Sequence, residues 1–168
     1  MKARQLQMDI GWIIDAHDDH ARKESKRFRK VDGKTSYAIH PIACAALLLH
    51  EQAIPEADRY AGAQALIYHD LLEDTTAELP SWLNERVRAL VSAMTFKSSD
   101  AEMEEVWERA AEVRMLKLFD KVSNLLDGGW MSEEKRRKYQ NYTRRLATDV
   151  ETHYGNLNIV KIAKAICG

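Results

Sequence analysis

Six consecutive residues, the segment 69–74, include four side chains that can bind a metal ion or move a proton. They follow an apolar run that we expect to be helical and buried. On a helix, His69 shares a face with Glu73, and Asp70 shares a face with Asp74, because each pair is four residues apart. Ionisable groups beside buried residues are costly unless a cation or a hydrogen-bond network satisfies them. An isolated His-Asp pair would indicate only a helix end with solvated acids, whereas the longer segment predicts a metal or acid–base site.

Two more residues elsewhere in the chain can join this site. His40 precedes Pro41, and proline favours the first turn of a helix, so His40 is expected at a helix entry. The alternative for His40 is a cap or a surface group. Asp120 lies beside the apolar stripe of a predicted long helix, where the alternative is an acid at the rim paired with Lys117 or Arg114. Together these positions give two imidazoles and two carboxylates, namely His40, His69, Asp70 and Asp120.

A mixed set of nitrogen and oxygen ligands suits Mn²⁺, Fe²⁺ or Zn²⁺ better than Ca²⁺, which prefers oxygen alone. Such an ion lowers the pKa of a bound water and produces a nucleophile near neutral pH. Glu73 and Asp74, about one turn beyond His69 and Asp70, are candidates to orient that water or to carry a proton.

The segment 26–37 is a basic loop with a glycine turn and an aromatic residue towards each end. Arginine in such a loop can bind phosphate with a forked donor and can stack on a base. The alternative is a solvated charged loop. A second charged run, 17–20, contains two histidines and two aspartates, and we interpret it as a solvated helix face rather than a metal cluster.

Helical periodicity and a scarcity of turn residues predict an all-α fold, since the chain has only three prolines and seven glycines. Ser81 and Ser132 are candidate N-caps, and Ser99 has capping-box spacing to Glu102. We expect a bundle of about six to eight helices. The clearest of these cover approximately residues 5–27, 41–50, 55–68, 81–94, 101–127, 132 onwards and 159–166.

Composition favours one domain over residues 1–168, and the net charge of −1 gives no basic field for nucleic acid. The two cysteines are far apart, which favours a reducing compartment. No apolar run reaches the length of a membrane span, and the N-terminus lacks the pattern of a signal peptide. We therefore expect a cytoplasmic protein without a membrane partner. A homo-oligomer is compatible with the sequence.

Three ordered motifs resemble those of the HD superfamily of metal-dependent phosphohydrolases. Within it, the sequence is most similar to the hydrolase domain of the RelA/SpoT alarmone family and to its small single-domain hydrolases. The matching elements are a basic loop followed by Tyr-x-x-His-Pro, a complete HDxxEDT motif, and a late KLxDxxxNL motif, found at residues 29–41, 69–75 and 117–125. The resemblance implies an all-α HD-domain helical bundle, and it extends over approximately residues 5–128.

The resemblance also implies roles for individual residues. The metal ligands would be His40, His69, Asp70 and Asp120, with Mn²⁺ as the ion or another divalent transition metal in its place. Glu73 and Asp74 would activate the water. Members of the family remove the 3′-pyrophosphate from ppGpp or pppGpp, so the substrate would be a nucleotide of the stringent response. The residues implied in substrate binding are Arg29, Lys30, Tyr37, Lys97 and Asn124.

Two departures from the family pattern bear on the substrate. Phe119 stands where the family has a small alanine, and the segment 98–115 is short. One alternative is therefore an HD phosphohydrolase or nucleotidase that acts on another nucleotide. A second is a non-catalytic helical module that binds a nucleotide, which the presence of every implied ligand and both acids disfavours. A nucleic-acid binder has support only from the basic helix that starts near residue 132.

Overall fold

The computed structural model describes residues 3–168, and within that range the chain is built from helices, with no β-strand. Eight α-helices have seven or more residues, and one, α4, has four; this confirms the predicted all-α bundle. The α-helices are α1 (Ala3–Asp19), α2 (Ile39–Leu49), α3 (Glu56–Tyr68), α4 (Leu71–Asp74), α5 (Glu85–Met94), α6 (Ser99–Glu105), α7 (Ala111–Leu126), α8 (Glu133–Tyr154) and α9 (Asn158–Cys167). Short 3₁₀ turns occur at η1 (Glu24–Lys26), η2 (Val106–Glu108) and η3 (Gly128–Trp130).

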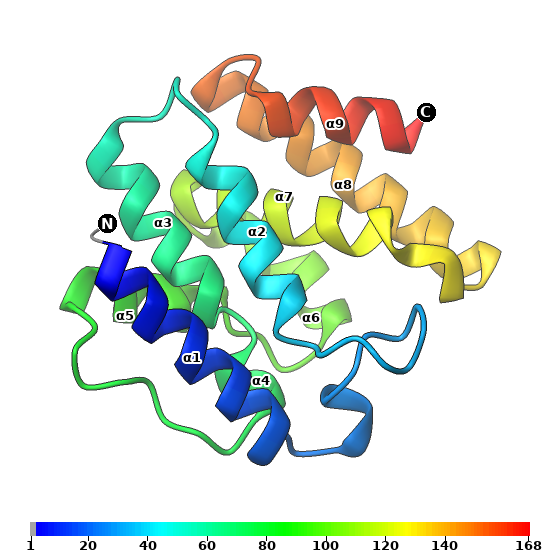
Figure 1. The fold of residues 1–168 in the computed structure, drawn as a ribbon. Coiled ribbons are helices and arrows are strands. Elements are labelled where there is room, and N and C mark those ends of the chain that lie inside the picture. The colour runs from blue at the N-terminus through cyan, green and yellow to red at the C-terminus, as the bar shows by residue number, and fades with distance from the viewer. Residues whose placement is uncertain (1–2) are drawn as a thin grey trace.

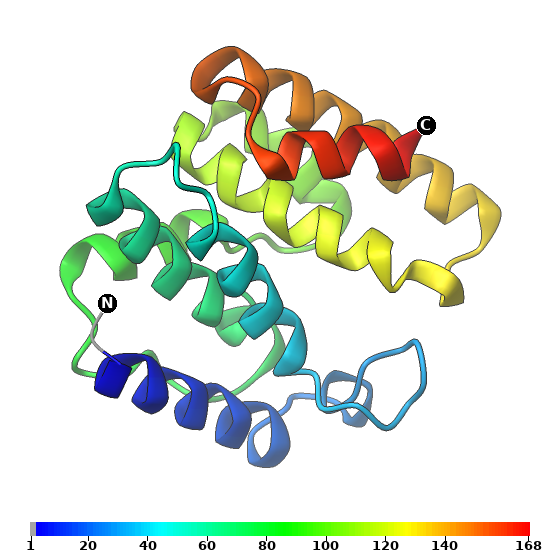
Figure 2. The same cartoon turned by 45° about the horizontal axis from the view of Figure 1, so that its top comes forward.

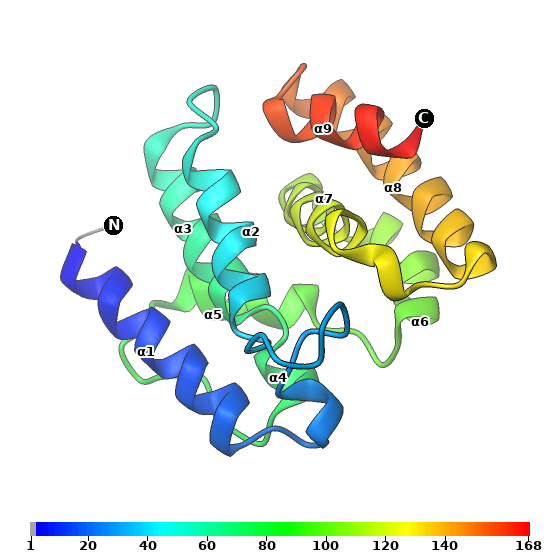
Figure 3. The same ribbon diagram turned by 45° about the vertical axis from the view of Figure 1, so that its right-hand side comes forward.

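The helices form two groups that meet along α2, α3 and α7 (Figure 1). In the first group α2 and α3 form an antiparallel hairpin, and α3 also packs against α1 and α5. In the second group α7, α8 and α9 pack on one another, as the turned views show (Figures 2 and 3). The contact between α2 and α7 joins the groups, and the polar segments 69–74 and 26–37 lie at the same end of this junction (Figure 3).

The junction depends on close approach of three helices at Gly62 of α3. A Cβ atom at this position would lie 2.8 Å from Cδ2 of Leu48 on α2 and 3.0 Å from Cδ2 of Leu116 on α7. Both leucines are fully buried. Since interiors are close-packed, the absence of a side chain at Gly62 sets how near α3 lies to its two neighbours.

A buried carboxylate attaches α1 to the rest of the bundle. Asp9 accepts hydrogen bonds from the Gln64 Nε2 (2.9 Å), the Tyr68 hydroxyl (2.8 Å) and the Trp82 Nε1 (2.9 Å). The first two donors are on α3 and the third is in the segment that leads to α5. A buried charge needs such partners, and here they fix the position of α1 on α3.

A second buried carboxylate attaches α9. Glu51, just beyond α2, accepts hydrogen bonds from the backbone N–H groups of Asn158 (3.1 Å) and Ile159 (2.7 Å), which open α9. The first N–H groups of a helix have no partner within the helix, so a carboxylate from elsewhere satisfies them and complements the helix dipole.

The first helix is shorter than predicted, ending at Asp19 rather than near residue 27. The following residues pair instead with the segment after α4: His20 O accepts from the Thr76 N–H (2.9 Å), and the Arg22 N–H donates to Asp74 O (2.8 Å). The prediction of a solvated face over 17–20 is wrong for His17, which is fully buried. Its Nδ1 lies 3.2 Å from the carbonyl oxygen of Lys26.

The predicted long helix 101–127 is divided into α6 and α7, because the chain turns through η2 and an extended Arg109. Two N-caps also differ from the prediction. Ser98, not Ser99, caps α6, and Asn84, not Ser81, caps α5. The cap of α8 at Ser132 is confirmed, since its hydroxyl accepts from the Lys135 N–H at 3.3 Å.

Candidate active site

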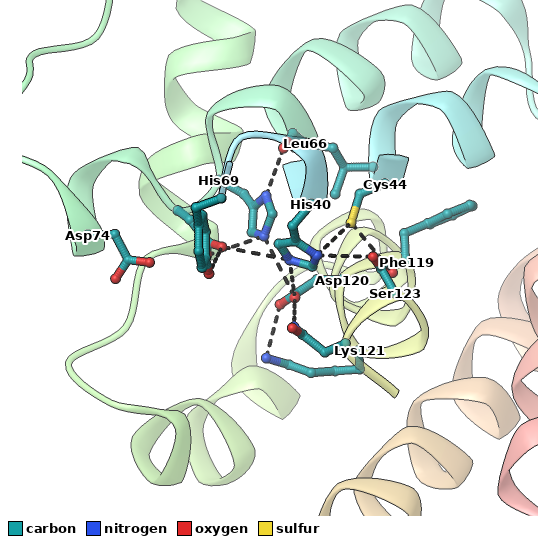
Figure 4. A network of polar contacts seen from close by, with 12 residues as sticks. His40, Cys44, Leu66, His69, Asp74, Phe119, Asp120, Lys121 and Ser123 are labelled. Carbon is teal, nitrogen blue, oxygen red and sulfur yellow. Dashed lines mark hydrogen bonds and ion pairs between the residues drawn. The ribbon is translucent and has the colours of Figure 1, made fainter. Parts of the chain in front are cut away.

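Three helices bring the proposed metal ligands together. His40 lies in the first turn of α2, His69 caps the C-terminus of α3, and Asp120 lies in the middle of α7. Each offers one donor atom, and these three atoms lie within 4.8 Å of one another (Figure 4). Asp120 Oδ1 is 3.2 Å from Nε2 of His40 and 3.7 Å from Nε2 of His69. All three side chains are buried, so the donors face one another away from bulk solvent.

The orientation of His69 fits a metal ion. Its Nδ1 lies 2.7 Å from the carbonyl oxygen of Leu66, and because a carbonyl can only accept, this nitrogen carries the hydrogen. In the neutral ring, Nε2 then presents a lone pair to the carboxylates of Asp70 and Asp120. Within residues 3–168 this atom is buried without a hydrogen-bond partner. A lone pair that faces two carboxylates needs a cation between them, either a metal ion or a proton on the ring.

The charges around His69 decide between these two cations. Burial lowers the pKa of the imidazole, but the negative charges of Asp70 and Asp120 outweigh burial and raise it to about 9. Without a metal ion the ring therefore holds a proton at neutral pH. A divalent ion would have to displace that proton, because a metal binds neutral imidazole.

Asp70 joins the site from the link between α3 and α4. Its Oδ1 is 3.2 Å from Nε2 of His69 and its Oδ2 is 3.7 Å from Nε2 of His40. The hydroxyl of Tyr37 donates to Asp70 Oδ2 at 2.8 Å. The structure thus places all four predicted ligands together, with Asp70 outside the mutually close trio and fixed by Tyr37.

Neighbouring side chains orient His40. Its Nδ1 lies 3.0 Å from the Ser123 hydroxyl and 3.8 Å from the Cys44 sulfur. Partners of this kind orient a ligand ring and fix its tautomer. Burial lowers the pKa of His40 despite the nearby Asp120, so this ring is set to stay neutral.

Asp120 divides its two oxygens between the imidazoles and two lysines. Oδ1 faces both imidazoles and accepts from the Asn124 Nδ2 at 2.6 Å, whereas Oδ2 is 2.9 Å from the Lys121 ammonium and 3.6 Å from that of Lys117. Burial alone would favour the neutral acid, but the two ammonium groups hold its pKa well below the usual range. Asp120 is therefore an ionised carboxylate. The alternative of a rim acid paired with Lys117 or Arg114 is correct for the pairing with Lys117, but the burial of Asp120 excludes a position at the rim.

The two lysines have their own counter-ion on α6. Glu102 Oε2 lies 3.1 Å from the Lys117 ammonium and 2.9 Å from that of Lys121, and its Oε1 accepts from the Tyr142 hydroxyl at 3.1 Å. With Asp120, this gives two buried cations and two buried anions, so the charges of the network are balanced. Burying Glu102 in this network is one reason why the chain turns between α6 and α7.

The two predicted catalytic acids lie on α4 beside the proposed metal ligands. Glu73 Oε1 accepts from the Phe96 N–H at 2.8 Å, and burial raises the pKa of this carboxyl. Asp74 Oδ1 is 2.6 Å from the Lys26 ammonium. Burial and the charge of Asp70 raise the pKa of Asp74, with Lys26 opposing them. Glu73 has no cation within ion-pair distance among the described residues, whereas Asp74 is paired with Lys26.

A cavity of about 360 Å³ opens over this group, with Asp70, Glu73, Asp74 and Asp120 in its walls. All five predicted substrate residues line it as well: Arg29, Lys30, Tyr37, Lys97 and Asn124. The structure therefore brings the predicted metal, acid and substrate residues around one space.

Three of the predicted substrate residues are already engaged with the protein. The Arg29 guanidinium pairs with Asp127 (2.8 and 2.7 Å), donates to Asn124 Oδ1 (3.3 Å) and lies over the ring of Tyr37. Asn124 also donates to Asp120, and Tyr37 donates to Asp70. These side chains would present a fixed surface to a substrate, whereas Lys97 is exposed.

The cavity is also lined by residues that sequence reasoning did not assign to it, among them Lys26, Lys121, Glu102, Trp130 and Lys135. Lys30 and Lys135 both place their ammonium groups 4.6 Å from the centre of the Trp130 ring. The basic loop gave a signal for Lys26. Of the other four, Glu102 lies on α6 before the turn at η2 and the rest lie after it, and only Lys121 falls within the KLxDxxxNL motif.

Phe119 does not line this cavity. Its side chain is fully buried in the core, so the larger residue extends the core rather than the cavity wall. The short segment after Lys97 does contribute, through Ser98, Ser99 and Glu102.

Comparison with solved structures identifies the architecture. The chain superposes on the structure of a protein described as a metazoan ortholog of SpoT that hydrolyzes ppGpp and plays a role in starvation responses. The TM-score is 0.73, the identity is 19%, and the match covers 99% of this chain and 95% of the other. The chain has the HD-domain fold. This confirms the resemblance drawn from the motifs at the level of the fold.

The other comparisons found no counterpart: no family model matches the chain, and no curated protein matches it. Over the part that the structure describes, none of the helices is both long and apolar enough to span a bilayer.

The basic side chains of α8 largely contact other parts of the protein. Arg144 binds the carbonyl of Cys167, Arg145 stacks on Trp107, and Lys138 pairs with Asp100.

Proposed function

We propose that this protein is a metal-dependent phosphohydrolase whose substrate is ppGpp or pppGpp and whose reaction releases the 3′-pyrophosphate. The observation that supports this most is the convergence of two imidazoles and a carboxylate from α2, α3 and α7 beside a cavity lined by cations. The fold shared with a protein described as hydrolysing ppGpp supports the choice of substrate.

His40, His69, Asp70 and Asp120 would hold the ion, and we propose Mn²⁺. The lone pair of His69 Nε2, buried without a hydrogen-bond partner among residues 3–168, and the mixed donor set fit a divalent transition metal. When bound, the ion would supply Lewis acidity and lower the pKa of a coordinated water towards neutrality.

The chain's own residues have separate tasks in this proposal. Glu73, fixed by the Phe96 N–H, takes the proton of the attacking water, because burial raises its pKa and no ion pair among the described residues occupies its carboxylate. Asp74 helps to orient the water and is itself held by its ion pair with Lys26. Glu102 neutralises Lys117 and Lys121. Their attraction for Asp120 is thereby weakened, and Asp120 Oδ1 remains available to bind the ion.

Substrate binding is assigned to the opposite wall of the cavity. Lys30 and Lys97 would neutralise the phosphates of the nucleotide, and the rigid guanidinium of Arg29 would offer a flat surface to the guanine base. The ring of Tyr37 would support Arg29 from behind, while Asn124 would face the ribose and its phosphates. We place this activity in one cytoplasmic domain over residues 1–168 that acts on a small molecule rather than on nucleic acid.

The deciding experiment is to load the protein with Mn²⁺ and follow ppGpp by anion-exchange chromatography. GDP and pyrophosphate should appear in equal amounts, and chelation should stop the reaction. A panel of other nucleotides, assayed under the same conditions, tests the second candidate, an HD phosphohydrolase for a different nucleotide. Residues of α6 form one wall of the cavity, and α6 belongs to the segment that departs from the family pattern. This departure favours the second candidate, a different nucleotide substrate. Absence of turnover for ppGpp and for the whole panel would contradict the proposal.

A further inference from the structure

Lys26 lies directly beside the two acids of the candidate active site. It is the last residue of η1, and its ammonium is 2.6 Å from Asp74 Oδ1. It lines the same cavity as Asp70 and Glu73. The predicted substrate residues did not include it, because nothing in the sequence connects position 26 to a residue 48 positions later.

The backbone on both sides of this ion pair is fixed. The carbonyl of Lys26 accepts from Nδ1 of the buried His17 (3.2 Å), and the Arg22 N–H donates to the carbonyl of Asp74 (2.8 Å). A further backbone hydrogen bond joins Thr76 to His20. The segment that carries Lys26 is therefore attached to the segment that carries Asp74, and this keeps the base of the lysine side chain beside the acids.

The ammonium retains donors for a second partner. It has three N–H groups, and within residues 3–168 the only acid in ion-pair contact with it is Asp74. The ring of Tyr37 lies 5.7 Å away and closes one side. The side chain is 36% exposed, and the exposed part belongs to the cavity wall. An anion in the cavity can thus bind Lys26 without displacing Asp74.

Two other cations of the cavity are more fully engaged with acidic side chains. Arg29 pairs with Asp127, and Lys121 lies between Glu102 and Asp120. Lys30 and Lys135 both lie at the Trp130 ring. Lys26 alone among the described cations pairs with one of the two acids of α4, next to the metal ligands.

We infer that Lys26 binds the phosphate group that is cleaved, while Asp74 holds its ammonium in place. This inference rests on the proposed function, because it assigns the anion in the cavity to a phosphate. An ion pair at the surface contributes little to stability. The inference gives the Lys26–Asp74 pair a role in binding instead. The role is binding of an anion by a positioned charge, in which the proton stays on the lysine.

The test is calorimetric titration of inorganic pyrophosphate into the Mn²⁺-loaded full chain. Lys26→Met should weaken pyrophosphate binding about tenfold or more, the range expected for loss of a hydrogen bond to a charged group. Lys26→Arg should retain most of the affinity because it keeps the charge. Lys23→Met is the matched control, since Lys23 is exposed in the same loop and lies outside the cavity lining, and it should bind as the wild type does.

Three results would overturn the inference. The first is unchanged affinity in Lys26→Met, and the second is an equal loss in Lys26→Met and Lys23→Met, which would indicate a general charge effect. The third concerns the double variant Asp74→Asn, Lys26→Met. We expect it to bind pyrophosphate more weakly than Asp74→Asn alone, and equal affinity of the two would show that Lys26 acts only through Asp74. Circular dichroism and metal content should match the wild type in every variant, and loss of Mn²⁺ from Lys26→Met would assign the residue to the metal site instead.

Pyrophosphate binding does not require turnover, so this test separates the inference from the proposed function. If the wild type hydrolyses no ppGpp but its pyrophosphate binding depends on Lys26, the proposed substrate is wrong and the phosphate site stands. If Lys26→Met hydrolyses ppGpp with unchanged kcat and KM, the inference alone is wrong.

Discussion

At the scale of single residues, the candidate site separates holding an ion from moving a proton. Asp120 faces both imidazoles, whereas Glu73 makes no hydrogen bond or ion pair with the proposed ligands in the described part of the chain and is held by a backbone N–H. The two carboxylates lie in the same cavity but in different electrostatic surroundings, because lysines surround Asp120 and burial dominates at Glu73. This difference predicts that replacing each carboxylate by its amide will affect a different property of the protein.

Asp120→Asn should lose Mn²⁺, because the amide removes the charged ligand while keeping its size. Glu73→Gln should keep Mn²⁺ and lose turnover by about 10²-fold or more, as expected for removal of a general base. Metal content by mass spectrometry of the purified variants and initial rates with ppGpp give both answers. Equal metal content and equal rates in the two variants would contradict this division of roles.

Metal affinity should depend on pH through His69. With its pKa raised to about 9 in the metal-free protein, the ring is protonated below that pH, and Mn²⁺ must displace the proton. The apparent affinity should therefore rise with pH by up to about tenfold per unit between pH 6 and 8, since one proton is released. Asp120 adds no further slope because its pKa lies well below this range.

Titrations of Mn²⁺ in buffers of different ionisation enthalpy measure both the affinity and the proton released. An affinity that is flat between pH 6 and 8, with no proton released, would show that His69 is neutral before the ion binds. The exposed His153→Gln variant is the control, because its ring lies on α8 and takes no part in the site.

At the scale of helices, buried carboxylates hold helices that are distant in the sequence against one another. Glu51→Ala should destabilise the protein by about 1–3 kcal/mol, because two N–H groups at the start of α9 lose their acceptor in a buried place. Urea unfolding measures the loss, and hydrogen exchange should show it first at the amides of Asn158 and Ile159. Gln52→Ala, at the exposed neighbouring residue, should change stability little. Equal stability of the two variants would show that α9 does not depend on Glu51.

Sequence periodicity and capping predicted those helices whose ends are determined locally. The cap at Ser132 and the last helix near 159–166 agree with α8 and α9. The errors occur where tertiary contacts end a helix. Backbone pairing of His20 and Arg22 with the segment after α4 ends α1 early, and burial of Glu102 against the lysines of α7 accompanies the turn at η2. Neither partner is near in sequence, so no local pattern could have indicated these ends.

The same reason limits what the sequence could say about the site. The order of the motifs indicated which residues gather around the cavity, because their types and spacing are unusual together. The sequence did not reveal that Tyr37 fixes Asp70, that Lys26 pairs with Asp74, or that Glu102 balances two lysines. Each of these pairs joins residues at least 15 positions apart, and only the fold brings them together.

At the scale of the whole molecule, the site depends on how closely two groups of helices approach. Gly62→Ala should destabilise the protein by about 1–3 kcal/mol, because the added methyl group would overlap Leu48 and Leu116 at the junction of α2, α3 and α7. The same change should weaken Mn²⁺ binding, since His40, His69 and Asp120 lie on those three helices. Thermal unfolding with and without Mn²⁺ measures both effects.

Gly11→Ala is the matched control for that substitution, because a Cβ at this position on α1 meets no atom within 4 Å. It should leave stability unchanged or raise it slightly, since alanine favours a helix over glycine. Equal behaviour of the two variants would show that the junction tolerates a wider spacing.

The distribution of the three clustered donors along the chain has a consequence for biosynthesis. His40 and His69 are translated early, but Asp120 follows 51 residues after His69. A nascent chain that has not yet exposed α7 outside the ribosome lacks the third donor, so it cannot assemble the complete centre. The proposed activity would therefore appear only after α7 has emerged, and products terminated before Asp120 would be inert instead of partly active.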